Sequence, residues 1–453
     1  MLNYSCNILA LIYLVIVLKE RGRILALCNI LNYGHFMSNF RDVYLILFSL
    51  YWAQGLPVGF MTHALPVILR AEGVSLAHIG GFGLLMLPWS IKILWAPLID
   101  RYGSLKQGHY RSWIIPTQIL TIITLVILAF LPIQSLNQPL YLFIFFIVLM
   151  SMNIFGATQD IATDGLAVNI LKEHQQHWGN MIQVIGSRLG FIVGGGVILW
   201  ILDALNWQVT FLLLAVLVTI NTIPILLYKE SEYSEKQTSK NQKNKRTQIQ
   251  DYLRYFFQSK TLKLWLFVLL TFKVADGLSG PLLKPLMVDL GLSFTQIGLY
   301  ITVLGAIAAL FGAGLAGIIL KFYTIAPTLI IFSIFKVMSL WAYVWLAYQY
   351  ESKTIIANWV IYSINAVEDM VSSMLLVAML TLILKYSRKT FAATDFTFQV
   401  ALMATMSGVL YSISGFIGDV LGYFSYLFII SLIAIVCLIP IVYWSKNSNM
   451  NDK

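Results

Sequence analysis

Gly73-Val-Ser-Leu-Ala-His-Ile-Gly80 recurs 218 residues later as Gly291-Leu-Ser-Phe-Thr-Gln-Ile-Gly298. Each copy follows a long apolar segment, residues 43–64 in the first case and residues 261–283 in the second. A sequence motif that returns at a large fixed offset is typical of a chain built from two similar halves. The sequence therefore predicts a duplicated architecture.

The composition around the two copies is that of a membrane protein. Apolar and aromatic residues make up 59% of the 453 residues, charged residues make up 11%, and the mean hydropathy is +0.79. A soluble domain carries about 25% charged residues, so a soluble globular enzyme is excluded. A membrane-spanning helix needs about 20 mainly apolar residues. Twelve segments meet this need: 43–64, 78–98, 112–134, 139–168, 179–203, 207–228, 261–283, 295–320, 325–348, 354–384, 391–415 and 421–444.

The basic residues predict how these spans are oriented. With both termini placed in the cytoplasm, 22 of the 30 Lys and Arg residues fall on the cytoplasmic side, three on the opposite side and five within or at the edge of spans. Cytoplasmic loops of membrane proteins collect Lys and Arg. The split supports twelve spans, because one miscounted span would mix the two sets. The net charge of +10 is explained in this way and is no sign of a nucleic-acid partner.

The expected organisation is an all-α membrane protein with two six-helix halves in the same orientation. Residues 1–42 form an N-terminal extension, with Met37 as an alternative start. The halves are residues 43–228 and 261–445, joined by a polar cytoplasmic linker at 229–260 and followed by a tail at 446–453. Three scattered cysteines indicate no disulfide framework and no zinc cluster. No enzyme, nucleotide-binding or metal motif is present, so neither a catalytic residue nor a cofactor is expected.

The loop after the second span reads Asp100-Arg101-Tyr-Gly103 and continues with basic residues. It resembles the signature of the major facilitator superfamily. Asp100 can accept hydrogen bonds from a helix N-terminus or an arginine, and Gly103 permits a tight turn. We expect Asp100, Arg101 and Gly103 to form a gating loop; the alternative is an ordinary charged loop.

Two carboxylates share one face of the fourth span. Asp160 and Asp164 are four residues apart, flanked by Gln159 and Thr163. Ionised groups inside a bilayer are costly and mark pathways or pairs, and two close carboxylates disfavour joint ionisation. We expect this pair to accept a proton, with Arg188 of the fifth span as its counter-charge. The alternative is a static salt bridge between helices.

Further ionisable groups are candidates for substrate contact or coupling. Lys273 and Asp276, three residues apart, can neutralise each other. Lys92 follows Pro88 and has no partner nearby in the sequence, so it is a candidate for binding an anionic substrate; the alternative is a lysine that reaches toward the membrane surface.

The remaining candidates are less clearly placed. Glu368 and Asp369 are adjacent, so they point to different faces of the tenth span, and one of them is a coupling candidate. Lys336 reads as structural. Gln54 lies in a Gly55-Leu-Pro57 stretch that predicts a helix break facing substrate.

Several motifs together resemble the AmpG-type permeases from about residue 43 to the end of the chain. They are Gln54-Gly-Leu-Pro57, Lys92-Ile-Leu-Trp95-Ala-Pro-Leu, Arg111-Ser-Trp113, Ala157-Thr-Gln159-Asp160-Ile-Ala-Thr-Asp164 and Arg188-Leu-Gly190. The resemblance implies a bacterial inner-membrane secondary transporter that imports anhydromuropeptides, with protons as the expected coupling ion.

A second branch, the RhtX/FptX-type permeases, imports ferric siderophores. The chain ends after the twelfth predicted span, and Lys284-Pro-Leu-Met-Val-Asp289 and Ala393-Thr-Asp395 are more similar to that branch. The resemblance therefore favours siderophore import, with anhydromuropeptide import or transport of another metabolite, such as an acyl-CoA, as alternatives. The siderophore itself would hold the iron, so no iron site in the protein is implied.

Overall fold

The structure is a computed structural model that describes residues 40–65, 68–69, 82–104, 107–131, 138–198, 201–202, 205–230, 254–293 and 296–451. The described chain is helical apart from turns, loops and one isolated bridge between Ser104 and Gly108. The first copy of the repeated motif, most of the predicted linker and nearly all of the predicted N-terminal extension lie outside these residues.

Helical segments occupy the positions of all twelve predicted spans. In the N-terminal half they are α3 (Phe40–Gly59) with the π-helical η1 (Phe60–Ala64); η2 (Phe82–Met86), α6 (Leu87–Ile91), η3 (Lys92–Leu94) and α7 (Ala96–Arg101); α8 (Arg111–Phe130); α9 (Pro139–Ile170); α10 (Gln176–Phe191) with η6 (Ile192–Val197); and α12 (Trp207–Leu227). In the C-terminal half they are α15 (Lys260–Phe272) with α16 (Val274–Asp289), η7 (Ile297–Val303) with α18 (Leu304–Phe322), α19 (Ile325–Glu351), α20 (Asn358–Tyr386), α21 (Ala392–Leu421), and α22 (Tyr423–Val436) with α23 (Leu438–Asn451).

Nine helices of the described chain are long and apolar enough to cross a membrane on their own. The second, fifth and eleventh predicted spans fall short of that standard. The second is divided into short helical pieces, and the fifth and eleventh correspond to α10 and α21. Both α10 and α21 contact helices of both halves. A helix that packs mainly against protein can carry polar residues that a lipid-facing helix cannot.

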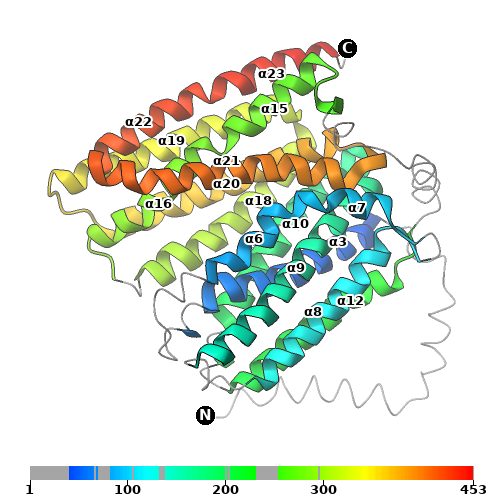
Figure 1. The fold of residues 1–453 in the computed structure, drawn as a ribbon. Coiled ribbons are helices and arrows are strands. Elements are labelled where there is room, and N and C mark those ends of the chain that lie inside the picture. The colour runs from blue at the N-terminus through cyan, green and yellow to red at the C-terminus, as the bar shows by residue number, and fades with distance from the viewer. Residues whose placement is uncertain are drawn as a thin grey trace.

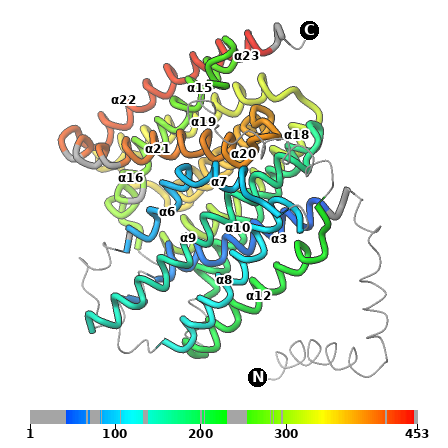
Figure 2. The backbone as a smooth tube through the Cα atoms, turned by 45° about the vertical axis from the view of Figure 1, so that its right-hand side comes forward, coloured from blue at the N-terminus to red at the C-terminus, as the bar shows by residue number. Residues whose placement is uncertain are grey.

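The two halves lie side by side (Figures 1 and 2), with the N-terminal half coloured blue to green and the C-terminal half light green to red. One buried apolar cluster, around Phe60 and Phe211, lies within the N-terminal half, and another, around Tyr343 and Tyr426, lies within the C-terminal half. A third cluster contains residues of both halves, such as Ile161 and Phe396. The halves are therefore separate packing units that share one common core.

The second copy of the repeated motif ends one helix and starts the next. Gly291 has φ +90°, and the N–H groups of Gly291 and Leu292 donate to the carbonyls of Val288 and Met287. This is the glycine-dependent stop of a helix C-terminus. Ser293 and Gln296 then exchange hydrogen bonds of 2.9 and 3.2 Å, which form a capping box at the following helix start.

One local expectation is wrong. Pro57 does not break its helix, because α3 runs through it and the distortion is taken up by the π-helical turn η1 just beyond. Gly103 has no positive φ; in its loop that conformation belongs to Gly108, at +93°. A Cβ on Gly103 would instead lie 2.1 Å from Nδ1 of His109, so close packing accounts for the glycine.

Candidate functional site

Lys92 and Asp160 form a buried ion pair between two helical segments of the N-terminal half. Lys92 begins η3, the turn that follows the Pro88-containing helix α6, and its Nζ contacts Oδ2 of Asp160 on α9. Nε2 of Gln54, on α3, donates to the other oxygen of the same carboxylate. Lys92 is 5% exposed and lies over the Trp89 ring, 5.5 Å from its centroid. Three segments thus meet at one carboxylate.

Asp164 lies one turn further along α9 and has different partners. The hydroxyl of Tyr51 donates to its Oδ1 at 2.9 Å, and Nε2 of Gln183 donates to the same oxygen at 3.3 Å. The residue is 2% exposed. Neither donor carries a charge, so the two aspartates of α9 sit in different electrostatic surroundings. Gln183 was not among the predicted site residues, because no sequence spacing connects it to α9. Tyr51 lies in the same stretch as Gln54, which was expected to face substrate, but its bond to Asp164 was not predicted.

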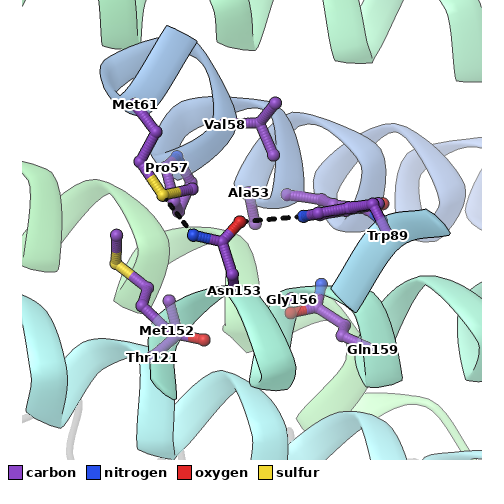
Figure 3. Close-up of a pocket in the computed structure, with 11 residues that line it drawn as sticks. Ala53, Pro57, Val58, Met61, Trp89, Thr121, Met152, Asn153, Gly156 and Gln159 are labelled. Atoms are coloured by element: carbon purple, nitrogen blue, oxygen red, sulfur yellow. Dashed lines mark hydrogen bonds between the residues drawn. The ribbon is translucent and has the colours of Figure 1, made fainter. Parts of the chain in front are cut away.

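A small cavity of about 10 Å³ adjoins this group and is lined by residues of α3, α6, α8 and α9. Figure 3 shows Asn153 between Met61 and Trp89, with Nε1 of Trp89 donating to its Oδ1 at 2.9 Å. Among described residues, buried Nε2 of Gln159 and Oε1 of Gln54 have no hydrogen-bond partner. The cavity has room for about one water molecule, which is the usual partner of such groups.

Arg188 is not the counter-charge of the α9 carboxylates, since Lys92 takes that place. Arg188 has no hydrogen bond or ion pair to another residue of the described chain, and it is half-buried on α10. Its electrostatic influence reaches Asp369 on α20, in the other half. Oδ2 of Asp369 accepts from Asn365 at 2.9 Å. The helix α10 packs against both α18 and α20, which explains why Arg188 faces across the boundary between the halves.

The C-terminal half has its own charged network. Lys273 contacts Oδ2 of Asp276 at 2.6 Å, which confirms the predicted local pair. Lys336 of α19 contacts Oδ1 of Asp276 at 2.8 Å and also pairs with Glu368 of α20. Ser372 bonds to both Lys336 and Glu368. Lys336 therefore joins the predicted candidates into one group in which two cations face two carboxylates. Glu368 and Asp369 point to different partners, as predicted.

The loop that begins at Asp100 fastens the halves together at one end of the molecule, here called the Asp100 face. The Asp100 carboxylate accepts from the backbone N–H groups of Ala393 and Thr394, at 3.1 and 2.7 Å, where α21 begins. The hydroxyl of Tyr110 donates to it at 2.7 Å. Burial raises the pKa of Asp100 to about 6, outweighing the hydrogen bonds, which lower it. Arg101 is exposed and stacks on Tyr102.

Further contacts close the same face. Nδ2 of Asn180 on α10 donates to Thr381 of α20 at 3.2 Å, and Lys385 pairs with Glu173 at 3.3 Å. Sulfur Sδ of Met181 lies 2.5 Å from where a Cβ on Gly317 would be. The predicted gating loop is thus part of a closed contact between the halves.

The known proteins that this chain resembles are membrane transporters. The model of the family described as acetyl-coenzyme A transporter 1 matches residues 42–212. The anhydromuropeptide permease of Escherichia coli (strain K12) is 28% identical over 416 residues, which is 89% of this chain and 81% of that protein. A putative transporter AmpG 4 of Rickettsia felis is 23% identical and covers 91% of this chain and 99% of its own length.

Solved structures share the fold. The fucose transporter FucP, a major facilitator protein in its outward conformation, aligns with a TM-score of 0.62 at 12% identity, covering 89% of this chain and 97% of its own. An outward-facing bacterial homologue of the iron transporter ferroportin aligns with a TM-score of 0.62 at 14% identity, covering 89% and 99%. This chain, similar to AmpG-type permeases, is thus a multi-pass membrane transporter with the major facilitator fold and not an enzyme.

Proposed function

We propose that this transporter imports anhydromuropeptides across the bacterial inner membrane, coupled to protons. The similarity to the E. coli permease over 89% of the chain supports this substrate class. The observation that carries the mechanism is the buried group formed by Lys92, Asp160 and Asp164, since ionisable residues are retained within membranes where they serve transport.

The proposed mechanism is alternating access by rocking of the two halves. The Asp100 face is the cytoplasmic one, because the basic loops gather there, and its contacts hold the transporter closed toward the cytoplasm. A substrate entering from the opposite side meets Arg188 at the boundary between the halves. Its guanidinium suits a carboxylate of a peptide. Asp369, which is within electrostatic reach of Arg188, is the group that would take that carboxylate's place after release.

Import of a ferric siderophore, which the sequence favoured, finds no support in the comparisons. Lys92, Arg188 and Lys273 would suit the oxygen-rich groups of either substrate, so the charges do not choose between them. The similarity to a permease of anhydromuropeptides supports that substrate class.

The test uses E. coli cells that lack their own anhydromuropeptide permease. We expect the chain to restore retention of radiolabelled anhydromuropeptide. The Arg188→Ala variant should reduce uptake by at least about tenfold, the loss of one charged hydrogen bond to the substrate. Lys263→Ala, which removes an exposed cation, is the matched control. Uptake of a ferric siderophore without any muropeptide uptake would return the assignment to the siderophore branch.

A further inference from the structure

We infer that Asp164 is the residue that binds and releases the coupled proton, and that Tyr51 and Gln183 are positioning residues that connect its charge to α3 and α10. The inference rests on the proposed proton coupling and deepens it. It assigns the coupled proton to one aspartate of the α9 pair and names the residues that bond to it.

The two aspartates differ in their counter-charges. Asp160 accepts from Lys92 on one oxygen and from Gln54 on the other, so its charge is balanced. Asp164 has no ion pair in the part of the chain that the structure describes. The group of Lys92, Asp160 and Asp164 therefore has one cation for two carboxylates. One bound proton makes it neutral, and the ion pair leaves Asp164 to hold that proton.

The C-terminal network shows the contrast. Lys273 and Lys336 face Asp276 and Glu368, two cations against two carboxylates, so that network is neutral with every group ionised. It needs no proton. Asp369, beside this network, has the guanidinium of Arg188 within electrostatic reach. The carboxylate left without a cation of its own is therefore Asp164 on α9.

The charged and titratable groups around Asp164 can be followed from each neighbouring segment. The segments α3 and η3 contribute Tyr51 and Lys92, and α9 itself contributes Asp160. At the Asp100 face, α7 and α21 also pack against α9, but Asp100 is held by backbone amides and Asp395 by Arg388. Helix α20 also packs against α9, and there Glu368 pairs with Lys336 and Asp369 accepts from Asn365. The charges that reach Asp164 are those of Lys92 and Asp160.

Protonation of Asp164 weakens the hydrogen bonds that it accepts from Tyr51 and Gln183. Tyr51 and Gln183 both bond to Oδ1, which leaves Oδ2 for the proton. Hydrogen bonds to an ionised carboxylate are roughly twice as strong as those to a neutral group. Protonation therefore loosens the hold of α9 on α3 and α10 together.

The helices α3 and α10 then carry the change to the other half. Their backbones touch, since a Cβ on Gly190 would lie 2.6 Å from Cα of Gly55. They therefore move as one unit. Because α10 also packs on α18 and α20, a shift of this unit alters the boundary between the halves.

The test is an infrared titration of the reconstituted protein, which needs no substrate. As the pH falls, we expect the C=O absorption of protonated carboxylic acids to gain a band that Asp164→Asn lacks and that changes frequency in Asp164→Glu. The band of Asp100, whose pKa is raised by burial, should remain in both variants. Tyr51→Phe should keep the Asp164 band and move its midpoint to higher pH by about one unit, because the carboxylate loses one donor. Tyr426→Phe, which removes a buried hydroxyl that bonds to the Leu278 carbonyl, should titrate as the wild type does.

A wild-type spectrum from which Asp164→Asn removes no band, or a Tyr51→Phe midpoint equal to that of the wild type, would overturn the inference. If Asp164→Asn does not fold, the band frequency in Asp164→Glu and the titration midpoint in Tyr51→Phe test the inference. In the transport assay, Asp164→Asn should retain substrate exchange and lose accumulation driven by a pH gradient. Failure of the wild type to carry muropeptide would overturn the proposed function alone, because the infrared result does not depend on substrate.

Discussion

The ion pair between Lys92 and Asp160 affects stability mainly through the free-energy penalty for breaking it. Both side chains are almost fully buried, and the carboxylate also accepts from Gln54. Two charges taken out of water gain little over an apolar pair, whereas removing one partner leaves a buried charge without compensation. The pair therefore matters most through the penalty for breaking it. It also holds η3, a short turn with few hydrogen bonds of its own, against the long helix α9.

Lys92→Ala should lower the stability of the protein by about 3–5 kcal/mol, because Asp160 is then buried without a counter-charge. The double variant Lys92→Ala/Asp160→Ala should lose less than Lys92→Ala does. Thermal unfolding in detergent measures both, with Lys263→Ala, on the exposed side of α15, as the control that should change little. Equal losses in the single and double variants would contradict a charge penalty and indicate lost packing instead.

At the scale of helices, the contact between α3 and α10 depends on glycine. Gly55, Gly59, Gly190 and Gly194 let the two backbones approach so closely that a Cβ at any of them would meet backbone atoms within about 3 Å. Small residues at such positions are how helices associate in membranes, where apolar surface alone does not drive them together. This close approach is what brings Tyr51 and Gln183 to the same oxygen of Asp164.

Gly190→Ala should separate α3 from α10 and reduce transport severely, since its Cβ would lie 2.6 Å from the backbone of Gly55. We expect a loss of about 1–3 kcal/mol, the usual cost of forcing extra atoms into packed contacts. Gly196→Ala is the matched control in the same span, because a Cβ there meets nothing within 4 Å. Uptake and thermal unfolding of both variants provide the check. If both behave alike, backbone contact does not set the position of α10.

For the whole molecule, the decisive feature is the closed Asp100 face. Asp100 reaches from the N-terminal half to the first amides of α21, so a negative group lies at the positive end of a helix of the other half. Such a contact can form only while the halves are together at this face. It therefore stabilises one of the two states between which the transporter rocks.

Asp100→Ala should shift the protein toward the state that is open at the Asp100 face, because two backbone amides of α21 lose their acceptor. Spin labels at the exposed positions 172 and 389, one on each half, report this opening as a longer distance by double electron–electron resonance. Asp289→Ala, which removes an exposed carboxylate bonded to Tyr423 at the other end of the molecule, is the control. An unchanged distance distribution in Asp100→Ala would show that the remaining contacts hold the face closed without it.

Patterns within one segment were the part of this protein that could be predicted. Apolar length located the spans, the three-residue spacing of Lys273 and Asp276 predicted their pair, and adjacency separated Glu368 from Asp369. The predictions that failed concerned how a segment continues in three dimensions and which other segments it contacts. Pro57 was expected to break a helix that instead continues, and Arg188 was assigned to carboxylates that Lys92 and two neutral donors hold.

The sequence by itself determined that the chain crosses a membrane many times and which ionisable residues lie within its spans, and it predicted two similar halves. Hydrophobicity, periodicity and spacing act along the chain, so they can be read from it. Only the tertiary structure decided that Lys92 pairs with Asp160, that Lys336 joins Asp276 to Glu368, and that Asp164 has neutral partners. These contacts join different helices, and which helices meet depends on packing across the whole bundle rather than on the distance between residues in the chain.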